Sequence, residues 1–397
     1  MRFEITSVPR IIFGPGTFKE VGGIAREFGA RALVVTGGDP SRVGQLGELL
    51  KSHGVASAIF SLNGEPKTTD VEAGLAQARQ LQAELVISCG GGSAIDCGKA
   101  IAAMLTNEGE LLDYLEVIGK GRPIMCPGAP FIAIPTTAGT GAELTRNAVL
   151  ASPEHGVKVS LRSPLMLARV ALVDPELTLS LPPEITAATG LDALTQLIEP
   201  YTCNRANPMT DGLCLEGLQR AARSLREVFT NGTNLAARED MCAASLFSGF
   251  ALANAGLGAA HGFAAPIGGQ FPAPHGAVCA ALLPQVMRQN LMALRQRAPG
   301  SDSLARYQTV ARALTGNSQA KAEDSVDWVS ELTGFMRIPP LRVYGIRRED
   351  FPGLVAKAAK ASSMKANPIA LTVEELTGIL EQAWQSNCGI WNADCGM

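Results

Sequence analysis

The sequence has few of the features that mark nucleic-acid-binding or membrane proteins. Its formal net charge is −3, and it contains no block of Lys and Arg and no basic patch rich in aromatic residues. These absences argue against a nucleic-acid partner and give no general attraction to an anionic membrane. No uninterrupted apolar run reaches transmembrane length, and the first residues do not resemble a signal peptide. We therefore expect a cytoplasmic protein that does not contact a membrane.

Paired cysteine motifs are also missing. Nine cysteines are scattered along the chain without the CxxC spacing of redox and zinc sites. Most, such as Cys89, Cys97 and Cys279, lie in apolar segments and are expected to be buried free thiols in a reducing compartment. Cys388 and Cys395 lie in a polar C-terminal tail, where a redox or metal role is an alternative that their spacing does not support.

A chain of 397 residues suits two domains, each large enough to bury its own core. The first half alternates β-like runs such as RALVVTGG and ELVISC with helix-like runs such as VEAGLAQARQLQA. This alternation predicts parallel βαβ units with helices on both faces of a sheet. From Pro182 onward, long amphipathic runs rich in Ala and Leu predict a helical domain. We expect an α/β domain over residues 1–180 and an all-α domain over residues 181–397.

The turn GGGS, Gly90–Ser93, follows the strand-like ELVISC and opens a helix. Glycines let a phosphate approach the backbone, and a helix N-terminus offers free N–H groups to a diphosphate. The spacing differs from GxGxxG, so it is no Rossmann fingerprint, and a tight turn without a ligand is the alternative. On the following helix, Asp96 is the better candidate for a polar contact, whereas Lys99 can be explained as a solvated side chain.

Two further polar loops follow predicted strands. PTTAGTGAE, Pro135–Glu143, offers hydroxyls and backbone N–H groups to phosphate or ribose, although such loops are common. The segment TGGDPSR lies where nucleotide-binding βα units often place an acidic residue on the ribose 2′-hydroxyl. Gly37 and Gly38 stand there instead, and the following Ser41 and Arg42 could receive a 2′-phosphate. A plain surface turn is the alternative.

Histidine is scarce, with four in the whole chain, yet His261 and His275 both lie in HGFAAPIGGQFPAPHG. The segment GLDALTQLIE places Asp192 and Gln196 four residues apart, on one face of a predicted helix. Carboxylate, amide and imidazole atoms all coordinate divalent ions, so these four positions form a candidate metal site. The alternatives are a helix N-terminal acid for Asp192 and a satisfied buried histidine for His261.

Taken together, several segments resemble the iron-containing (group III) alcohol dehydrogenases in order and spacing, over essentially the whole chain. They are GGGSAIDCGK, PTTAGTGAE, LVDPELTLSLP, GLDALTQLIE and HGFAAPIGGQFPAPHG. The resemblance implies a nucleotide-binding α/β domain followed by an all-α metal domain, as in dehydroquinate synthase and glycerol dehydrogenase. It also implies hydride transfer between NAD(P) and a small alcohol, aldehyde or ketone in the interdomain cleft. Helical domains with large apolar faces often pair, so a homodimer is expected.

The resemblance assigns roles to individual residues. It implies a contact with the cofactor diphosphate or nucleotide for Gly91, Gly92, Ser93, Thr136, Thr137, Thr140 and Thr145. It places Lys158 near the cofactor as a candidate catalytic residue, although a lone lysine in a strand is usually a solvated side chain. Many relatives that prefer NAD carry Asp where this chain has Gly37. Loss of that carboxylate removes repulsion against a 2′-phosphate and favours NADP.

The family pattern has Asp, His, His and His as ligands to iron or zinc, and this chain departs from it at two positions. Asp192, His261 and His275 match, but Gln196 stands at the second ligand, and Ala265 replaces a histidine that lies near the nicotinamide. The site is therefore either a weakened Fe²⁺ or Zn²⁺ site or a metal-free polar pocket. A metal would polarise the substrate oxygen, whereas without one a protonated His261 or His275 would stabilise the alkoxide and donate the proton. Ala265 also suggests a substrate bulkier or less polar than a small diol.

Two other functions share this fold. A lyase similar to dehydroquinate synthase would eliminate rather than transfer hydride, but the PTTAGTG and PAPHG segments favour the dehydrogenase. A degenerate member that binds nucleotide without turnover is suggested by Gln196 and Ala265.

Overall fold

A parallel six-stranded sheet forms the centre of the N-terminal unit, Met1–Leu181, in the computed structural model, which describes residues 2–37 and 41–385. The strand order is β1-β8-β5-β4-β2-β3, and every pairing in this sheet is parallel. The strands are β1 (Arg10–Phe13), β2 (Arg31–Gly37), β3 (Ala56–Leu62), β4 (Leu85–Gly90), β5 (Phe131–Pro135) and β8 (Val170–Val173). The predicted βαβ organisation is confirmed.

Helices connect these strands, as parallel pairing requires. They are α1 (Val21–Arg26), α2 (Ser41–Ser52), α3 (Thr68–Leu81), α4 (Gly92–Thr106) and the short α5 (Leu111–Tyr114). The central strand β4 is buried along its whole length, which explains its continuous apolar run. An antiparallel hairpin, β6 (Asn147–Ser152) and β7 (Val157–Arg162), forms a separate two-stranded sheet that the sequence pattern did not predict.

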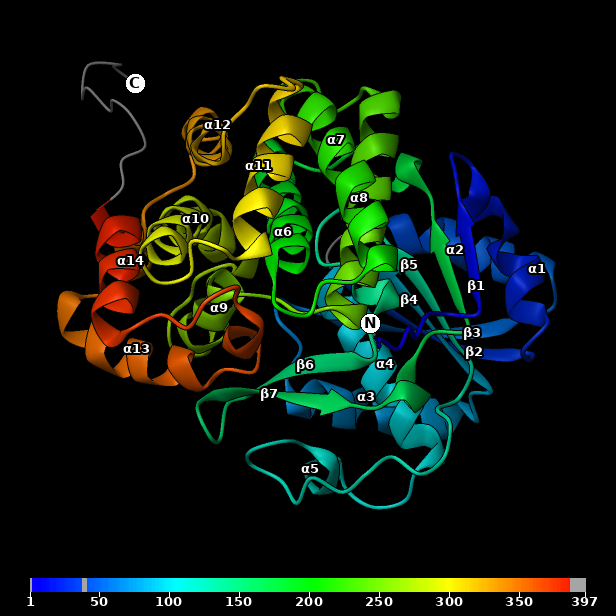
Figure 1. Ribbon diagram of the computed structural model, residues 1–397. Coiled ribbons are helices and arrows are strands. Elements are labelled where there is room, and N and C mark those ends of the chain that lie inside the picture. The colour runs from blue at the N-terminus through cyan, green and yellow to red at the C-terminus, as the bar shows by residue number, and fades with distance from the viewer. Residues whose placement is uncertain (1, 38–40, 386–397) are drawn as a thin grey trace, which may run out of the picture. The chain divides into compact units, whose positions relative to one another are not determined.

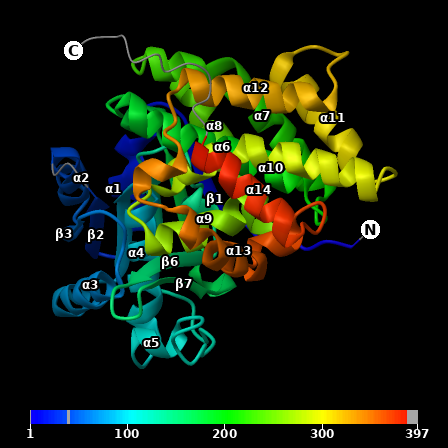
Figure 2. The same cartoon turned by 90° about the vertical axis from the view of Figure 1, so that its left-hand side faces the viewer.

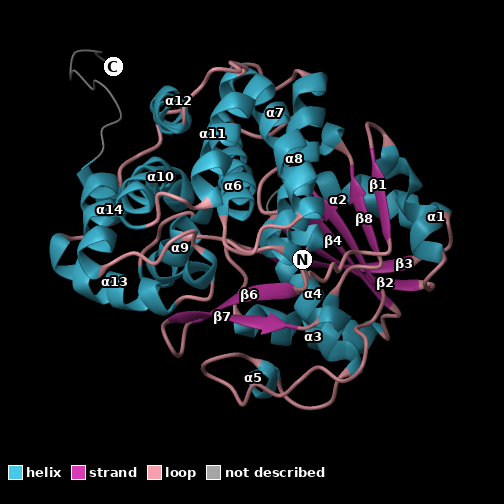
Figure 3. Cartoon of the chain, viewed as in Figure 1, coloured by secondary structure: helices cyan, strands magenta, loops and turns pink. Residues whose placement is uncertain are grey.

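The C-terminal unit, Pro182–Met397, is helical throughout its described part, as Figure 3 shows by the absence of strands there. Its helices are α6 (Pro183–Thr202), α7 (Pro208–Thr230), α8 (Leu235–Asn254), α9 (Ala259–Gln270), α10 (His275–Arg297), α11 (Asp302–Thr315), α12 (Ala322–Phe335), α13 (Phe351–Lys360) and α14 (Val373–Gln385). Short 3₁₀ turns complete both units. The expected fold class, an α/β region followed by an all-α region, is confirmed.

Two groups of helices build the interior of the C-terminal unit. Helix α6 contacts α7, α8 and α10, and it is buried from Gly190 to Thr202. A helix buried on every side lies in the core of its domain, so polar residues on α6 need partners inside the protein. A second apolar cluster joins α9, α10, α13 and α14, and Figure 2 shows α14 lying against α10.

Among the described helices, none is by itself long and apolar enough to cross a membrane. The pair α8 and α9 meets that test only when the two are taken together, across a bend of 94°.

Candidate metal centre

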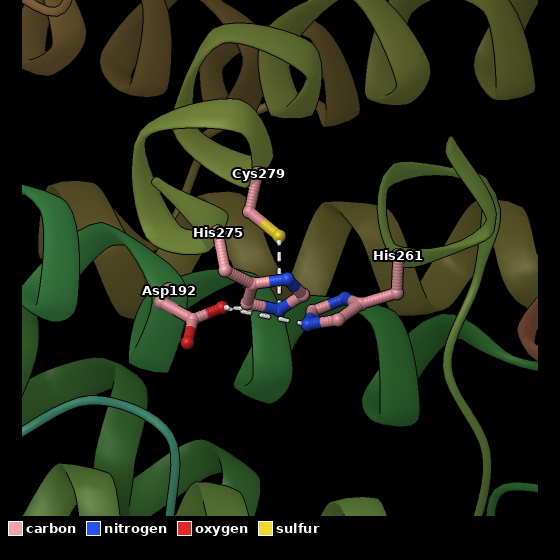
Figure 4. A group of neighbouring side chains, drawn as sticks. All are labelled: Asp192, His261, His275 and Cys279. Carbon is pink, nitrogen blue, oxygen red and sulfur yellow. Dashed lines mark hydrogen bonds and ion pairs between the residues drawn. The ribbon is translucent and has the colours of Figure 1, made fainter. Parts of the chain in front are cut away.

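Four side chains from three helices meet inside the C-terminal unit: Asp192 of α6, His261 of α9, and His275 and Cys279 of α10 (Figure 4). Each offers one ligand atom, and these four atoms lie within 4.8 Å of one another. Asp192 Oδ1 is 3.4 Å from His261 Nε2 and 3.8 Å from His275 Nε2. Cys279 Sγ is 3.7 Å from His275 Nε2. The structure therefore brings together three of the four predicted metal-binding residues, with a cysteine beside them.

Local sequence explains how these residues reach one place. His261 lies in the first turn of α9 and His275 is the first residue of α10. The short segment between the two helices, residues 271–274, contains two prolines and turns the chain so that both imidazoles face Asp192. At Gly276 the backbones of α6 and α10 come close, because a Cβ atom there would lie 2.3 Å from the carbonyl oxygen of Ala188. Only glycine permits this approach, which holds α10 against the turn of α6 that carries Asp192.

Glu199 orients His261. It lies two turns after Asp192 on α6, and its Oε2 is 2.7 Å from His261 Nδ1. The other oxygen, Oε1, accepts a hydrogen bond of 2.7 Å from the backbone N–H of Ala260. Because a carboxylate oxygen only accepts, Nδ1 carries a proton, and Nε2 is the ring nitrogen left to bind a metal ion. Carboxylate–histidine pairs of this kind commonly fix the tautomer of a metal-binding histidine.

Two buried atoms at the centre of the cluster have no hydrogen-bond partner in the described part of the chain, Asp192 Oδ1 and His261 Nε2. Asp192 is 1% exposed and His261 is 5% exposed. Buried polar atoms are almost always satisfied, so a facing pair of unsatisfied atoms needs an explanation. Two lone pairs separated by 3.4 Å are held together favourably only when a cation or a proton lies between them. The donor set and its orphaned atoms thus fit a divalent metal ion.

The charges of the cluster also favour a cation. For Asp192, burial acts to raise the pKa, but the nearby side chains of His275, His261 and Gln196 outweigh it and lower the pKa. For His261, burial acts to lower the pKa, but Cys279, Asp192 and Glu199 together raise it well above its usual value. The pKa of His275 is raised to about 9, mainly by Cys279 and also by Asp192, although burial acts to lower it. This environment stabilises positive charge, whether a proton or a metal ion supplies it.

Gln196, the fourth predicted ligand, lies one turn after Asp192 on α6 and acts on its charge, since it contributes to the lowered pKa of Asp192. Its carbonyl oxygen accepts a hydrogen bond of 3.1 Å from Ser248 Oγ on α8. Ala265 lies one turn after His261 on α9 and is exposed.

The two glycine- and threonine-rich loops of the N-terminal unit lie against each other. Strand β4 ends at Gly90 and α4 begins at Gly92, so the predicted strand, turn and helix are confirmed. A Cβ atom on Gly92 would lie 2.8 Å from Thr140 Oγ1, and one on Gly91 would lie 3.4 Å from Thr137 Oγ1. The backbone N–H of Thr136 donates to the carbonyl oxygen of Gly90. The N-terminus of α4 receives no side-chain cap, which leaves its N–H groups available to an anion.

Lys99 belongs to a buried polar cluster beneath these loops. It is 1% exposed, so its explanation as a solvated side chain is wrong. Its ammonium donates to the carbonyl oxygens of Ala142 and Asn147, each at 2.8 Å, and to Thr145 Oγ1 at 2.9 Å. Thr145, a predicted nucleotide contact, is therefore directed toward Lys99. Asp96, another predicted contact, accepts a hydrogen bond of 3.0 Å from the backbone N–H of Val149.

The other predicted cofactor contacts lie elsewhere in the N-terminal unit. Lys158 is on β7, and its Nζ pairs with Glu65 Oε2 at 2.5 Å, so it is not a freely solvated side chain. Gly37 is the last residue of β2. Gly38 lies outside the described residues, as do the side chains of Ser41 and Arg42 and all of Cys388 and Cys395.

Two residues beside the predicted ligands were not predicted to lie there, Cys279 and Glu199. The prediction that Cys89, Cys97 and Cys279 are buried free thiols is confirmed. The place of Cys279 beside His275 was not predicted, although it follows His275 by four residues and therefore lies on the same helix face. Glu199 ends the GLDALTQLIE segment, seven residues after Asp192. Helical spacing from Asp192 could have identified Glu199, and spacing from His275 could have identified Cys279.

Comparisons with known proteins agree with this architecture. The family described as iron-containing alcohol dehydrogenase matches residues 9–175, and the C-terminal family of Fe-containing alcohol dehydrogenases matches residues 186–384. A 1,3-propanediol dehydrogenase of Klebsiella pneumoniae is 36% identical over 95% of this chain and 98% of its own length. A long-chain-alcohol dehydrogenase 1 of Geobacillus thermodenitrificans is 36% identical over 95% of this chain and 97% of its own. A solved 1,3-propanediol oxidoreductase superposes with a TM-score of 0.89 at 35% identity, covering 96% of this chain and 100% of that one.

Proposed function

Because the chain belongs to the iron-containing alcohol dehydrogenase family, we propose that Asp192, His261 and His275 hold the divalent metal ion of a hydride-transfer reaction. The chain is an oxidoreductase that transfers hydride between a nicotinamide cofactor and a small alcohol or aldehyde. The observation that carries the metal assignment is the facing pair of buried, unpartnered atoms, Asp192 Oδ1 and His261 Nε2. Neither the lyase nor the non-catalytic alternative has support among the family matches.

The protein residues prepare the site for this chemistry. A bound divalent metal ion supplies a Lewis acid for the substrate oxygen. Glu199 holds the proton of His261 on Nδ1 and thereby keeps Nε2 free to coordinate. His275 has the one half-open side chain of the four, at 38% exposed, so its side of the cluster is where a substrate oxygen can approach.

We propose that the cofactor diphosphate binds the turn at Gly91, Gly92 and Ser93. The uncapped N-terminus of α4 and the adjoining hydroxyls of Thr137 and Thr140 support this assignment. Other predictions about the cofactor stay predictions. They are the contacts at Thr136, Thr145, Asp96 and Lys158, and a preference for NADP set by Gly37, Gly38, Ser41 and Arg42. The homodimer and the cytoplasmic location also stay predictions.

The substrate is proposed to be less polar or bulkier than a small diol. Ala265 places a methyl group one turn after His261, where the family pattern has a histidine. The similarity to a long-chain-alcohol dehydrogenase supports this direction, while the similarity to 1,3-propanediol dehydrogenases opposes it. A panel of aldehydes and alcohols of increasing chain length separates the two. Preference for short diols would reject the proposal.

The metal mechanism is tested by following NAD(P)H oxidation with an aldehyde panel after chelation and after reloading with Fe²⁺ or Zn²⁺. Activity should fall in parallel with metal content and return with the metal. Full turnover in protein whose measured metal content is negligible would reject the metal assignment. No turnover under any condition would favour a protein that binds nucleotide without catalysis.

A further inference from the structure

We propose that Cys279 supplies the fourth protein ligand of the metal site. In the family pattern this ligand is a histidine at the position that Gln196 occupies here. This inference rests on the proposed function, since it concerns the same metal ion. It replaces the predicted Asp, Gln, His, His set with Asp192, His261, His275 and Cys279.

The thiol of Cys279 lies where a fourth metal ligand is needed. Cys279 follows His275 by four residues on α10, so both side chains leave the same face of the helix (Figure 4). Its sulfur belongs to the group of four ligand atoms that lie within 4.8 Å of one another. Cys279 is 0% exposed, so its sulfur is directed into the protein interior beside the two unpartnered atoms of Asp192 and His261.

The ligand atoms of the four side chains have separations close to those around a tetrahedral metal ion. A tetrahedral ion with bonds of about 2.0–2.1 Å to N or O and about 2.3 Å to S holds its ligand atoms roughly 3.3–3.7 Å apart. The structure has 3.4 Å between Asp192 Oδ1 and His261 Nε2, and 3.8 Å between Asp192 Oδ1 and His275 Nε2. The sulfur of Cys279 is 3.7 Å from His275 Nε2. The first and third of these separations fall within this range, and the second lies just beyond it.

Gln196 already has a partner inside the protein. Its carbonyl oxygen, the atom that would bind a metal, accepts a hydrogen bond of 3.1 Å from Ser248 Oγ on α8. Within the described part of the chain, Asp192 Oδ1 and His261 Nε2 have no such partner, and both lie beside the sulfur of Cys279. We therefore assign the coordinating role to Cys279 and a positioning role to Gln196.

The chemistry of the sulfur also favours Cys279 over Gln196. A coordinating thiol is deprotonated, and a thiolate is a stronger and softer ligand than a neutral amide oxygen. A thiolate ligand shifts the preference of the site toward softer ions, which favours Zn²⁺ over harder divalent cations.

The test uses the full-length protein loaded with Co²⁺, because a thiolate bound to Co²⁺ gives a sulfur-to-metal charge-transfer absorption that N and O ligands do not. The native protein and Gln196→Ala should show this absorption, and Cys279→Ser should lose it. The affinity for Zn²⁺ should fall by at least about 100-fold in Cys279→Ser, more than outer-shell changes usually cause. Cys214→Ala is the matched control, since Cys214 is equally buried but lies on α7, and it should keep both the absorption and the affinity.

The outcomes separate the two proposals. If the native protein binds neither Co²⁺ nor Zn²⁺, the proposed metal function fails. If it binds Co²⁺ without the charge-transfer absorption, the metal function stands and the role of Cys279 is rejected. Should Cys279→Ser fail to fold, X-ray absorption of the zinc-loaded native protein decides. One sulfur neighbour at about 2.3 Å supports Cys279, and a shell of N and O atoms alone overturns it.

Discussion

Lys99 and Asp192 are both buried charged side chains, one in each unit, but their surroundings differ. Each of the three N–H groups of the Lys99 ammonium has an acceptor, on Ala142, Thr145 and Asn147. Within the residues that the structure describes, Asp192 Oδ1 has no hydrogen-bond partner, and it faces His261 Nε2, which has none either. A satisfied cluster stabilises the fold by itself, whereas an unsatisfied one is completed by something that the chain does not provide. The comparison predicts that changes at Lys99 alter stability and that changes at Asp192 alter metal binding.

The largest effect is expected for Asp192→Ala. Loss of the central carboxylate should abolish metal binding and lower turnover by about 10³-fold or more, since metal catalysis supplies several kcal/mol. Metal content and the rate of NAD(P)H oxidation measure both effects, and circular dichroism checks that the variant is folded. A folded variant that retains metal and turnover would remove the distinction between the two clusters.

Lys99→Met should destabilise the N-terminal unit without loss of metal. Three acceptors would lose their donor inside the protein, at a cost of about 3 kcal/mol in the free energy of unfolding. Thermal and urea unfolding measure the change, and the metal content should equal that of the native protein. If the free energy of unfolding of the variant equals that of the native protein, the hydrogen bonds of Lys99 do not stabilise the fold.

A smaller effect is expected for Glu199→Gln. An amide in place of the carboxylate no longer fixes the Nδ1 proton of His261 by charge, so metal affinity should weaken by about 10- to 100-fold. Competition with a chelator of known affinity measures the change. Unchanged affinity would mean that the Glu199 contact serves packing alone.

The smallest effect concerns Glu143, whose pKa burial raises to about 7 from 4.5. Ionisation of such a carboxyl costs stability only above its unfolded pKa of 4.5, and the cost grows until the pH passes the folded pKa of about 7. Glu143→Gln removes the ionisation, so it should leave the free energy of unfolding unchanged at about pH 4 and raise it by about 1–2 kcal/mol at about pH 8. Urea unfolding at both pH values tests this, and an equal effect at both would contradict the raised pKa.

The fold was readable from the sequence wherever periodicity was strong. The buried run of β4, the glycine turn after it and the long apolar helices each gave a clear signal. The β6–β7 hairpin escaped, although β6 partly alternates between buried and more exposed residues and Gly156 in the turn has a positive φ. A short hairpin of this kind is easily lost among longer βαβ units.

Part of the site was also readable. Spacing and family resemblance singled out Asp192, His261 and His275, which the structure brings together, because histidine is rare in this chain and its position is therefore informative. The place of Cys279 beside them was not predicted, because a cysteine among Ala, Val and Leu is usually a core residue. The hydrogen bond from Ser248 to Gln196 joins residues 52 positions apart, and no local pattern encodes such a contact.

The close approach of α6 and α10 at Gly276 has a consequence for the cluster of ligand atoms. A Cβ atom there would lie 2.3 Å from the carbonyl oxygen of Ala188, so any side chain at this position would push α10 away from α6. His275 and Cys279 would move with α10, and their ligand atoms would move away from Asp192. The geometry of the cluster therefore depends on a residue that is not itself a ligand.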